Sequence, residues 1–244
     1  KFNALGVTQY GQMTAGSFMY IGPQGIVHGT TITILNANRM LKNSGNKIKL
    51  FVSSGLGGMS GAQPKAAKIA GLISVTAEIN KKAIEKRWEQ GWIDEIISDS
   101  ETLVTRIKKI QQTKKITAIG FLGNIIEVWE KLYEANIFID IGSDQTSLHN
   151  PFQGGYYPDN LSFNEANEMI KNNPKKYKQL VQKALRKHVK MINKHVKRGT
   201  YFFDYGNAFL LEAKRAKADI IKQNGDFKYP SYVQDIMGPL CFDY

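Results

Sequence analysis

A cluster of glycines and one acid give the first sign of chemistry in this sequence. An apolar run at about 47–53 leads into the glycines, which are Gly55, Gly57, Gly58 and Gly61. Such residues allow a tight turn and a close backbone approach to a pyrophosphate, and the helix that follows offers free N–H groups and a positive dipole end. Glu78 ends a second apolar run, 23 residues after Gly55, where an acid holds the ribose hydroxyls of NAD. The order strand, glycines, helix, strand and acid predicts a dinucleotide site.

The acid also bears on the choice of cofactor. A carboxylate at Glu78 accepts two ribose hydroxyls but repels a 2′-phosphate, so it favours NAD over NADP. Lys81 and Lys82 follow closely and weaken that preference a little. A purely structural interpretation stays open at this point, with the glycines in an ordinary turn and Glu78 at a solvated strand end.

Length and composition indicate a globular chain. At 244 residues and 42% hydrophobic content, it can bury a sizeable core as one domain, or as one domain with a small appendage. The sequence has no apolar run long enough to cross a bilayer and no signal peptide. Cys241 is the single cysteine, which excludes an internal disulfide and favours a reducing, cytoplasmic location. Both ends look like cuts through a longer protein.

The net charge of +12 raises the question of a nucleic-acid partner. Most of the excess is lysine between Lys171 and Arg198, where apolar residues recur at helical spacing: Leu180, Val181, Leu185, Val189, Ile192 and Val196. This pattern predicts an amphipathic helix with its lysines in water, without the interleaved aromatic residues of a base-stacking surface. We therefore expect neither a nucleic-acid nor a membrane partner.

Apolar runs alternate with helical patterns along the chain. We expect strands at about 47–53, 72–78, 94–98, 115–122, 138–141 and 201–204, and helices at about 31–43, 62–71, 80–90, 101–113, 124–135, 163–171, 174–198 and 207–218. This alternation predicts an α/β fold, a Rossmann-like three-layer sandwich with a mostly parallel sheet. We assign the domain to 22–225, with 1–21 and 226–244 as pieces of a flanking region.

Polar residues gather just after the expected strands. They are Ser53–Gly61, Glu78, Gly123 with Asn124, Asp144–His149 and Asp204–Asn207. In open α/β sheets, ligands bind at the edge formed by the carboxyl ends of the strands. We therefore expect these segments to surround one site.

Five segments together resemble one enzyme family. They are Tyr10-Gly-Gln-Met-Thr-Ala-Gly-Ser17, Tyr20-Ile-Gly-Pro-Gln-Gly-Ile-Val27, Gly55-Leu-Gly-Gly-Met-Ser-Gly-Ala-Gln-Pro64, Asp144-Gln-Thr-Ser-Leu-His149 and Phe203-Asp-Tyr-Gly-Asn207. They are similar to segments of urocanase (urocanate hydratase), and the match runs through nearly the whole chain. The resemblance implies a lyase of histidine catabolism that adds water to urocanate to give imidazolone propionate. It also implies a homodimeric full-length protein with tightly bound NAD⁺ that acts as an electrophile and not as a redox partner.

The resemblance further implies which residues contact NAD. They are Gln12, Gly58, Met59, Ser60, Glu78, Asn124, Ile125, Gln145, Thr146, Ser147, Leu148, His149, Tyr156, Tyr157 and Tyr205. Ser60 stands where the family commonly has another glycine, and Ala83 stands where many members have an arginine. The family's essential cysteine and a catalytic acid lie in a segment beyond residue 244. We therefore assign no catalytic residue and expect this chain to be inactive alone.

Other candidate residues have simpler interpretations. His188 and His195 are seven residues apart on the basic helix, and we expect both at the surface, with His28 packed or hydrogen-bonded. His149 is the histidine that we place in the site. No Cys/His cluster has metal-ligand spacing, so no metal is expected. Asp144 is interpreted as a helix cap or turn former, and the tryptophans are interpreted as packing anchors: Trp88, Trp92 and Trp129.

Two other functions remain as alternatives. An NAD-dependent dehydrogenase should carry a proton-relay set such as Tyr-x-x-x-Lys, which Tyr177 lacks because Leu180 and Val181 follow it. A non-catalytic dinucleotide-binding or nucleic-acid-binding module is the other alternative, and steep salt dependence of DNA binding would support the nucleic-acid form.

Overall fold

The computed structural model describes residues 22–41 and 48–237. Within them lies a six-stranded sheet of order β3-β4-β2-β1-β5-β6, and every pair of neighbouring strands is parallel. The strands are β1 (Leu50–Ser54), β2 (Ile73–Glu78), β3 (Glu95–Ile97), β4 (Ala118–Leu122), β5 (Ile141–Asp144) and β6 (Tyr201–Asp204). The predicted α/β, Rossmann-like fold is confirmed, and its sheet is wholly parallel.

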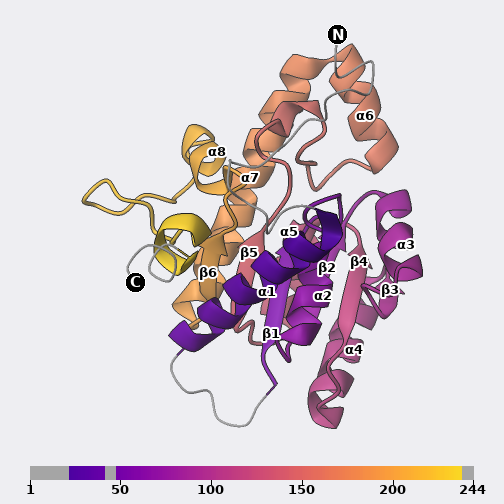
Figure 1. Ribbon diagram of the computed structural model, residues 1–244. Helices are drawn as coiled ribbons and strands as arrows, with labels where there is room; N and C mark the ends of the chain where they lie inside the picture. The colour runs from indigo at the N-terminus through magenta and orange to yellow at the C-terminus, as the bar shows by residue number, and fades with distance from the viewer. Residues whose placement is uncertain (1–21, 42–47, 238–244) are drawn as a thin grey trace.

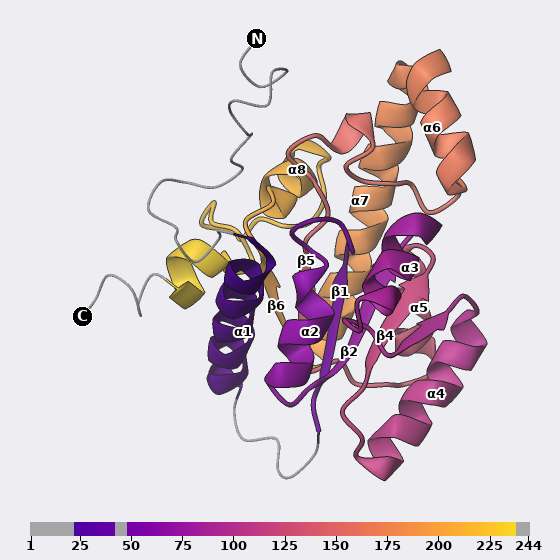
Figure 2. The same ribbon diagram turned by 45° about the vertical axis from the view of Figure 1, so that its right-hand side comes forward.

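Helices connect the strands and cover both faces of the sheet (Figures 1 and 2). They are α1 (Gly22–Met40), α2 (Ala62–Ile69), α3 (Lys81–Glu89), α4 (Ser100–Thr113), α5 (Ile125–Glu134), α6 (Phe163–Asn172), α7 (Pro174–Lys197) and α8 (Phe209–Arg215). Short helical turns occupy Pro151–Gln153 and Tyr232–Met237. Within the described ranges, no helix is both long and apolar enough to cross a membrane.

The two faces of the sheet carry different cores because side chains alternate along each strand. On one face, Phe51 and Ile141 pack against α1 and α2. On the other face, Val52 and Phe121 belong to the larger cluster, which also contains apolar residues of α4, α5, α7 and α8. The three layers therefore close around a sheet that is buried on both sides, as all-parallel sheets require.

Helix α7 has the amphipathic pattern that the sequence predicts, but its histidines contradict the prediction. Val181, Leu185 and Ile192 are fully buried, whereas most of the helix's lysines are exposed. His188 and His195 are 0% and 1% exposed, so their predicted surface position is wrong. Steps of seven residues from Val181 reach both histidines, which places them on the buried face of the helix.

Other predictions need smaller corrections. His28 is exposed and not packed. Trp88 is 54% exposed because Ile84 and Arg87 take the inward face of α3, whereas Trp129 is fully buried as predicted. The first helix begins at Gly22, nine residues before the predicted start, and its residues Ile34 and Ala37 pack against α2.

Strand β5 begins three residues later than predicted, at Ile141. The buried carboxylate of Asp140 accepts a hydrogen bond from the backbone N–H of Leu50 at 2.8 Å, which fixes the chain just before the strand. Gly142 then lies under Trp129, where a Cβ atom would meet the indole Cη2 at 2.5 Å. Close packing of a large ring on a bare backbone therefore requires glycine at this position of the strand.

We predict that Gly142→Ala destabilises the fold by about 1–3 kcal/mol, because the added methyl group overpacks the contact with Trp129. Urea unfolding followed by circular dichroism measures this change. Gly58→Ala is the matched control, since a Cβ atom there meets nothing within 4 Å. Equal losses in the two variants would contradict the packing explanation.

Candidate dinucleotide site

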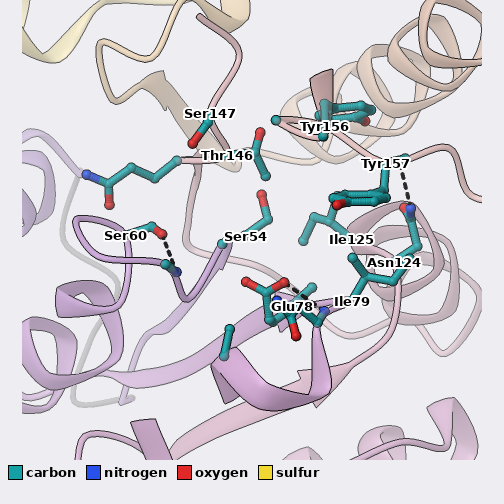
Figure 3. A pocket seen from close by; sticks show the side chains of 18 of the residues that line it. Ser54, Ser60, Glu78, Ile79, Asn124, Ile125, Thr146, Ser147, Tyr156 and Tyr157 are labelled. Carbon is teal, nitrogen blue, oxygen red and sulfur yellow. Dashed lines mark hydrogen bonds between the residues drawn. The ribbon is translucent and has the colours of Figure 1, made fainter. Parts of the chain in front are cut away.

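A cavity of about 250 Å³ opens at the edge formed by the carboxyl ends of the strands (Figure 3). Chain segments that follow β1, β2, β4 and β5 line it, together with the loop before α6. The chain runs from β1 to β2 in one direction across the sheet, and β5 and β6 lie on the other side of β1. The cavity therefore includes the point where the strand order reverses, which is the usual ligand site of this architecture.

The glycine-rich turn after β1 forms one wall of the cavity. Gly55 has a φ of +90°, which a side chain would strain, and its Cβ position lies 3.1 Å from the Gln145 carbonyl oxygen. The Gly57 N–H donates to the Ser60 hydroxyl at 2.9 Å, which closes the turn (Figure 3). The N–H groups of Gly58, Met59 and Ser60 have no acceptor among the described residues. Three N–H donors without acceptors in the described part of the chain, just before a helix, are an arrangement that suits an anion.

Glu78 reaches from the end of β2 to this turn. One of its oxygens accepts from the Leu56 N–H at 2.7 Å, and the other accepts from the Asn80 N–H at 2.9 Å. Burial raises the pKa of the Glu78 carboxyl, and these backbone donors oppose the rise. A carboxylate oxygen accepts more than one hydrogen bond, so Glu78 keeps capacity for hydroxyl groups of a ligand.

Asp144 joins the ends of β1 and β5 with the segment after β6. Its carboxylate accepts from the Thr146 hydroxyl at 2.6 Å, from the Asn207 side-chain amide at 2.9 Å and from the Ser54 hydroxyl. It also accepts from the Thr146 N–H at 3.1 Å, which confirms the predicted turn-forming role. The side-chain oxygen of Gln145, the next residue, is buried with no donor in the described part of the chain.

Asn124 and two tyrosines form the opposite wall (Figure 3). The Asn124 oxygen accepts from the Ile126 N–H at 2.9 Å and so caps α5, while its amide donates to the Tyr157 carbonyl oxygen at 2.9 Å. Tyr156 is almost fully buried, and its hydroxyl lies 3.1 Å from Nδ1 of His188. The wall is thus fixed to α5 and α7 before any ligand binds.

The structure brings most of the predicted site residues together. Nine line the cavity: Ser60, Glu78, Asn124, Ile125, Gln145, Thr146, Ser147, Tyr156 and Tyr157. Gly58 and Met59 belong to the turn without lining the cavity, Leu148 is buried in the main core, and His149 is exposed. Tyr205 lies apart, with its ring stacked on Tyr232 at 4.7 Å and its hydroxyl donating to the Thr30 hydroxyl at 2.8 Å. Gln12 lies outside the described residues.

Sequence reasoning missed several parts of the site. Gly154 and Gly155 line the cavity, and a Cβ at Gly155 would lie 2.0 Å from the Ser147 carbonyl oxygen. That pair of glycines was visible in the sequence as a signal of close backbone approach. Ala83 also lines the cavity, where the resemblance implies an arginine in many family members. No group of three or more His, Cys, Asp or Glu side chains suited to a metal occurs in the residues described.

The sheet order, the glycine-rich turn and the cavity at the strand reversal define a Rossmann-like fold of the dinucleotide-binding class. A family model for the urocanase Rossmann-like domain matches residues 22–236. The chain therefore belongs to the urocanase family.

Named relatives agree with this family assignment. The chain is 55% identical to a probable urocanate hydratase of Caenorhabditis elegans over 98% of its own length and 37% of the relative's length. It is 57% identical to a probable urocanate hydratase of Dictyostelium discoideum, over 98% of the chain and 36% of that protein. It is 51% identical to the urocanate hydratase of Homo sapiens, over 98% of the chain and 37% of that protein. The chain thus spans a little over a third of the length of these relatives.

We predict that His188 makes the domain less stable in acid. Burial lowers the pKa of His188 from 6.5 to about 4, so the folded protein holds a neutral imidazole where the unfolded chain binds a proton. The contribution of the neutral imidazole to the free energy of unfolding is fully present above pH 6.5. It is lost as the pH falls toward 4, up to about 3 kcal/mol in total. His188→Phe should flatten the dependence of the unfolding free energy on pH in this window, measured by urea unfolding. Tyr156→Phe is the control, because it removes the same hydrogen bond but keeps the imidazole. Equal slopes in wild type and His188→Phe would contradict the assignment.

Proposed function

We propose that this chain is the NAD-binding core of a urocanate hydratase. The observation that carries the proposal is the glycine-rich turn at the reversal of strand order. Gly57 and Ser60 of this turn line the cavity, and the N–H groups of Gly58, Met59 and Ser60 have no acceptor among the described residues. A pyrophosphate needs donors of this kind, and the dipole of α2 adds attraction for negative charge.

The residues around the cavity suit the other parts of NAD. Glu78 offers carboxylate oxygens at the distance along the chain where this fold class binds ribose hydroxyls. Gln145 offers a buried side-chain oxygen that has no donor among the described residues, which suits an amide or hydroxyl group of a ligand. The bare backbone of Gly55 and Gly155 lets the neighbouring loops pack closely around the cavity, since Cβ atoms there would meet the Gln145 and Ser147 carbonyl oxygens. The donor and acceptor groups around the cavity therefore suit the cofactor.

We propose roles for these residues in the hydration of urocanate. When bound, NAD⁺ supplies a cationic ring that withdraws electrons from the substrate imidazole. Tyr156 and Tyr157 cover one side of the cavity and exclude water from it. Asn124 and Gln145 hold the cofactor's polar groups still, and Glu78 binds a ribose. The remaining catalytic groups lie in the part of the relatives that this chain does not span.

The domain boundaries are also proposals. We propose that 22–225 forms the NAD-binding domain and that 226–237 begins a flanking region packed onto it. The bridge between Asp204 and Ser231 and the stacking of Tyr205 on Tyr232 support this contact. We further propose that the whole protein acts on urocanate as a cytoplasmic homodimer.

We predict that Glu78→Ala weakens NAD binding by about 1–3 kcal/mol, the usual cost of losing hydrogen bonds to a charged group. Isothermal titration calorimetry of the NAD-depleted protein measures this loss. Glu101→Gln is the control, because Glu101 is exposed on α4 and pairs with Lys131 away from the cavity. NADP should bind more weakly than NAD to the wild type. Unchanged NAD affinity in Glu78→Ala would remove Glu78 from the site.

We predict that the intact protein consumes urocanate without net reduction of its nicotinamide. The decline of urocanate absorbance and the absence of an absorbance band of reduced nicotinamide are followed in the same cuvette. Stoichiometric accumulation of free NADH would instead show dehydrogenase chemistry and overturn the hydratase proposal.

A further inference from the structure

Arg87 is a buried charged residue that the proposed site does not use. It lies on α3 with 8% of its surface exposed, and it does not line the cavity. Burial lowers its pKa and the Glu78 carboxylate opposes that change. Within the described residues no carboxylate approaches its guanidinium within ion-pair distance. A buried cation without a direct ion pair needs other partners.

Those partners are the carbonyl oxygens of the glycine-rich turn. Nε of Arg87 donates to the Leu56 carbonyl oxygen at 3.1 Å, and Nη2 donates to the Gly57 carbonyl oxygen at 2.6 Å. Nη1 donates to the Gln90 side chain at 2.6 Å, and the Trp92 ring lies 5.2 Å from the guanidinium carbon. Gln90 and Trp92 therefore orient the planar guanidinium on one side, and on the other side it donates hydrogen bonds to the carbonyl groups of two consecutive residues.

The side chain, the N–H and the carbonyl oxygen of Leu56 are each fixed by a different contact. Its side chain is fully buried against Ile84, Ile93 and Ala118. Its N–H donates to Glu78 at 2.7 Å while its carbonyl oxygen accepts from Arg87. The turn thus begins from a peptide whose orientation is fixed by side chains of β2 and α3.

The geometry of the trans peptide connects Arg87 to the ligand side of the turn. In a planar trans peptide, the C=O of one residue and the N–H of the next point in opposite directions. Because the Gly57 carbonyl points to Arg87, the Gly58 N–H points away from it, and that N–H is one of the unpaired donors. Likewise, the Leu56 carbonyl points to Arg87, and the Gly57 N–H reaches the Ser60 hydroxyl.

Gly61 makes room for this arrangement. A Cβ atom there would lie 2.1 Å from Nε of Arg87 and 2.8 Å from the Gly57 carbonyl oxygen. Its φ of −58° is ordinary for any residue, so space and not backbone strain requires glycine. Gly61, the last glycine of the turn, therefore leaves the space that the Arg87 guanidinium occupies.

We propose that Arg87 is a positioning residue that fixes the first two peptide groups of the glycine-rich turn and so aims the Gly58 N–H at a bound pyrophosphate. This inference rests on the proposed NAD function and deepens it. The guanidinium also places a positive charge beneath the turn that makes no direct ion pair within the described residues, and this charge adds attraction for a diphosphate. Lysine keeps that charge but cannot hold two carbonyl groups in a fixed plane.

The test compares ligands that carry or lack a diphosphate. In the intact, NAD-depleted protein, Arg87→Lys and Arg87→Gln should each bind NAD and ADP roughly 10-fold or more weakly than wild type, and adenosine unchanged. Arg106→Lys is the matched control, because it breaks a two-point hydrogen bond to Glu95 away from the turn. Unchanged affinity for NAD and ADP in Arg87→Lys would overturn the positioning role, as would an equal loss for adenosine.

Two further measurements keep the test independent of folding and of the proposed function. Gly61→Ala, which leaves Arg87 in the chain, should reproduce the diphosphate-specific loss by displacing the guanidinium. Hydrogen exchange of the ligand-free protein should show faster exchange of the backbone amides of residues 55–61 in Arg87→Lys than in Arg106→Lys. Equal exchange rates would overturn the proposal that Arg87 holds the turn. A wild-type protein that binds neither NAD nor ADP would overturn the proposed NAD function. The hydrogen-exchange result would still test whether Arg87 holds the turn through the Leu56 and Gly57 carbonyl groups.

Discussion

The reversal of strand order between β1 and β5 is the constraint on which the site depends. The reversal separates the loops that follow β1 and β5. The buried carboxylate of Asp144, at the end of β5, holds the strand ends together because it accepts hydrogen bonds from Ser54 at the end of β1 and from Asn207 after β6. A second buried set, in which the Ser53 hydroxyl donates to the Gln63 side chain and lies 3.0 Å from the Ser143 hydroxyl, ties the same two strands to α2. Polar groups that satisfy one another here hold the glycine-rich turn against the sheet.

From that fixed edge, the rest of the site is built with short connections. Glu78 and Arg87 fix the first peptides of the turn, and Asn124 fixes the start of α5 and the Tyr157 backbone. Each of these side chains satisfies backbone groups as well as facing or supporting the cavity. The same hydrogen bonds that stabilise the loops therefore preorganise the place where a cofactor would bind.

The fold was largely predictable from the sequence because local pattern and tertiary packing agree. Apolar runs and glycine turns located the strands, and the spacing on α7 located its buried face. The error on α7 occurs where buried polar groups take core positions. His188 and His195 satisfy one ring nitrogen each, through Tyr156 and the Trp129 carbonyl, and apolar periodicity alone does not reveal such partners.

The site was predictable only where chemistry sits in the loops after the strands. Glu78 ends β2, and Asn124 and Gln145 lie within two residues of the ends of β4 and β5, so the sheet edge brings the three together. Tyr205 is also close to a strand end, yet stacking on Tyr232 turns it toward α1. Arg87 lies about 30 residues from the carbonyl groups that it binds and sits within a helix, so no local signal marked it.

A crystal structure of the protein with NAD tests the central claim most directly. We expect the diphosphate oxygens to lie about 2.7–3.2 Å from the backbone nitrogens of Gly58, Met59 or Ser60, with a ribose hydroxyl hydrogen-bonded to Glu78. A structure in which NAD binds away from this turn, or leaves these nitrogens without an acceptor, would contradict it.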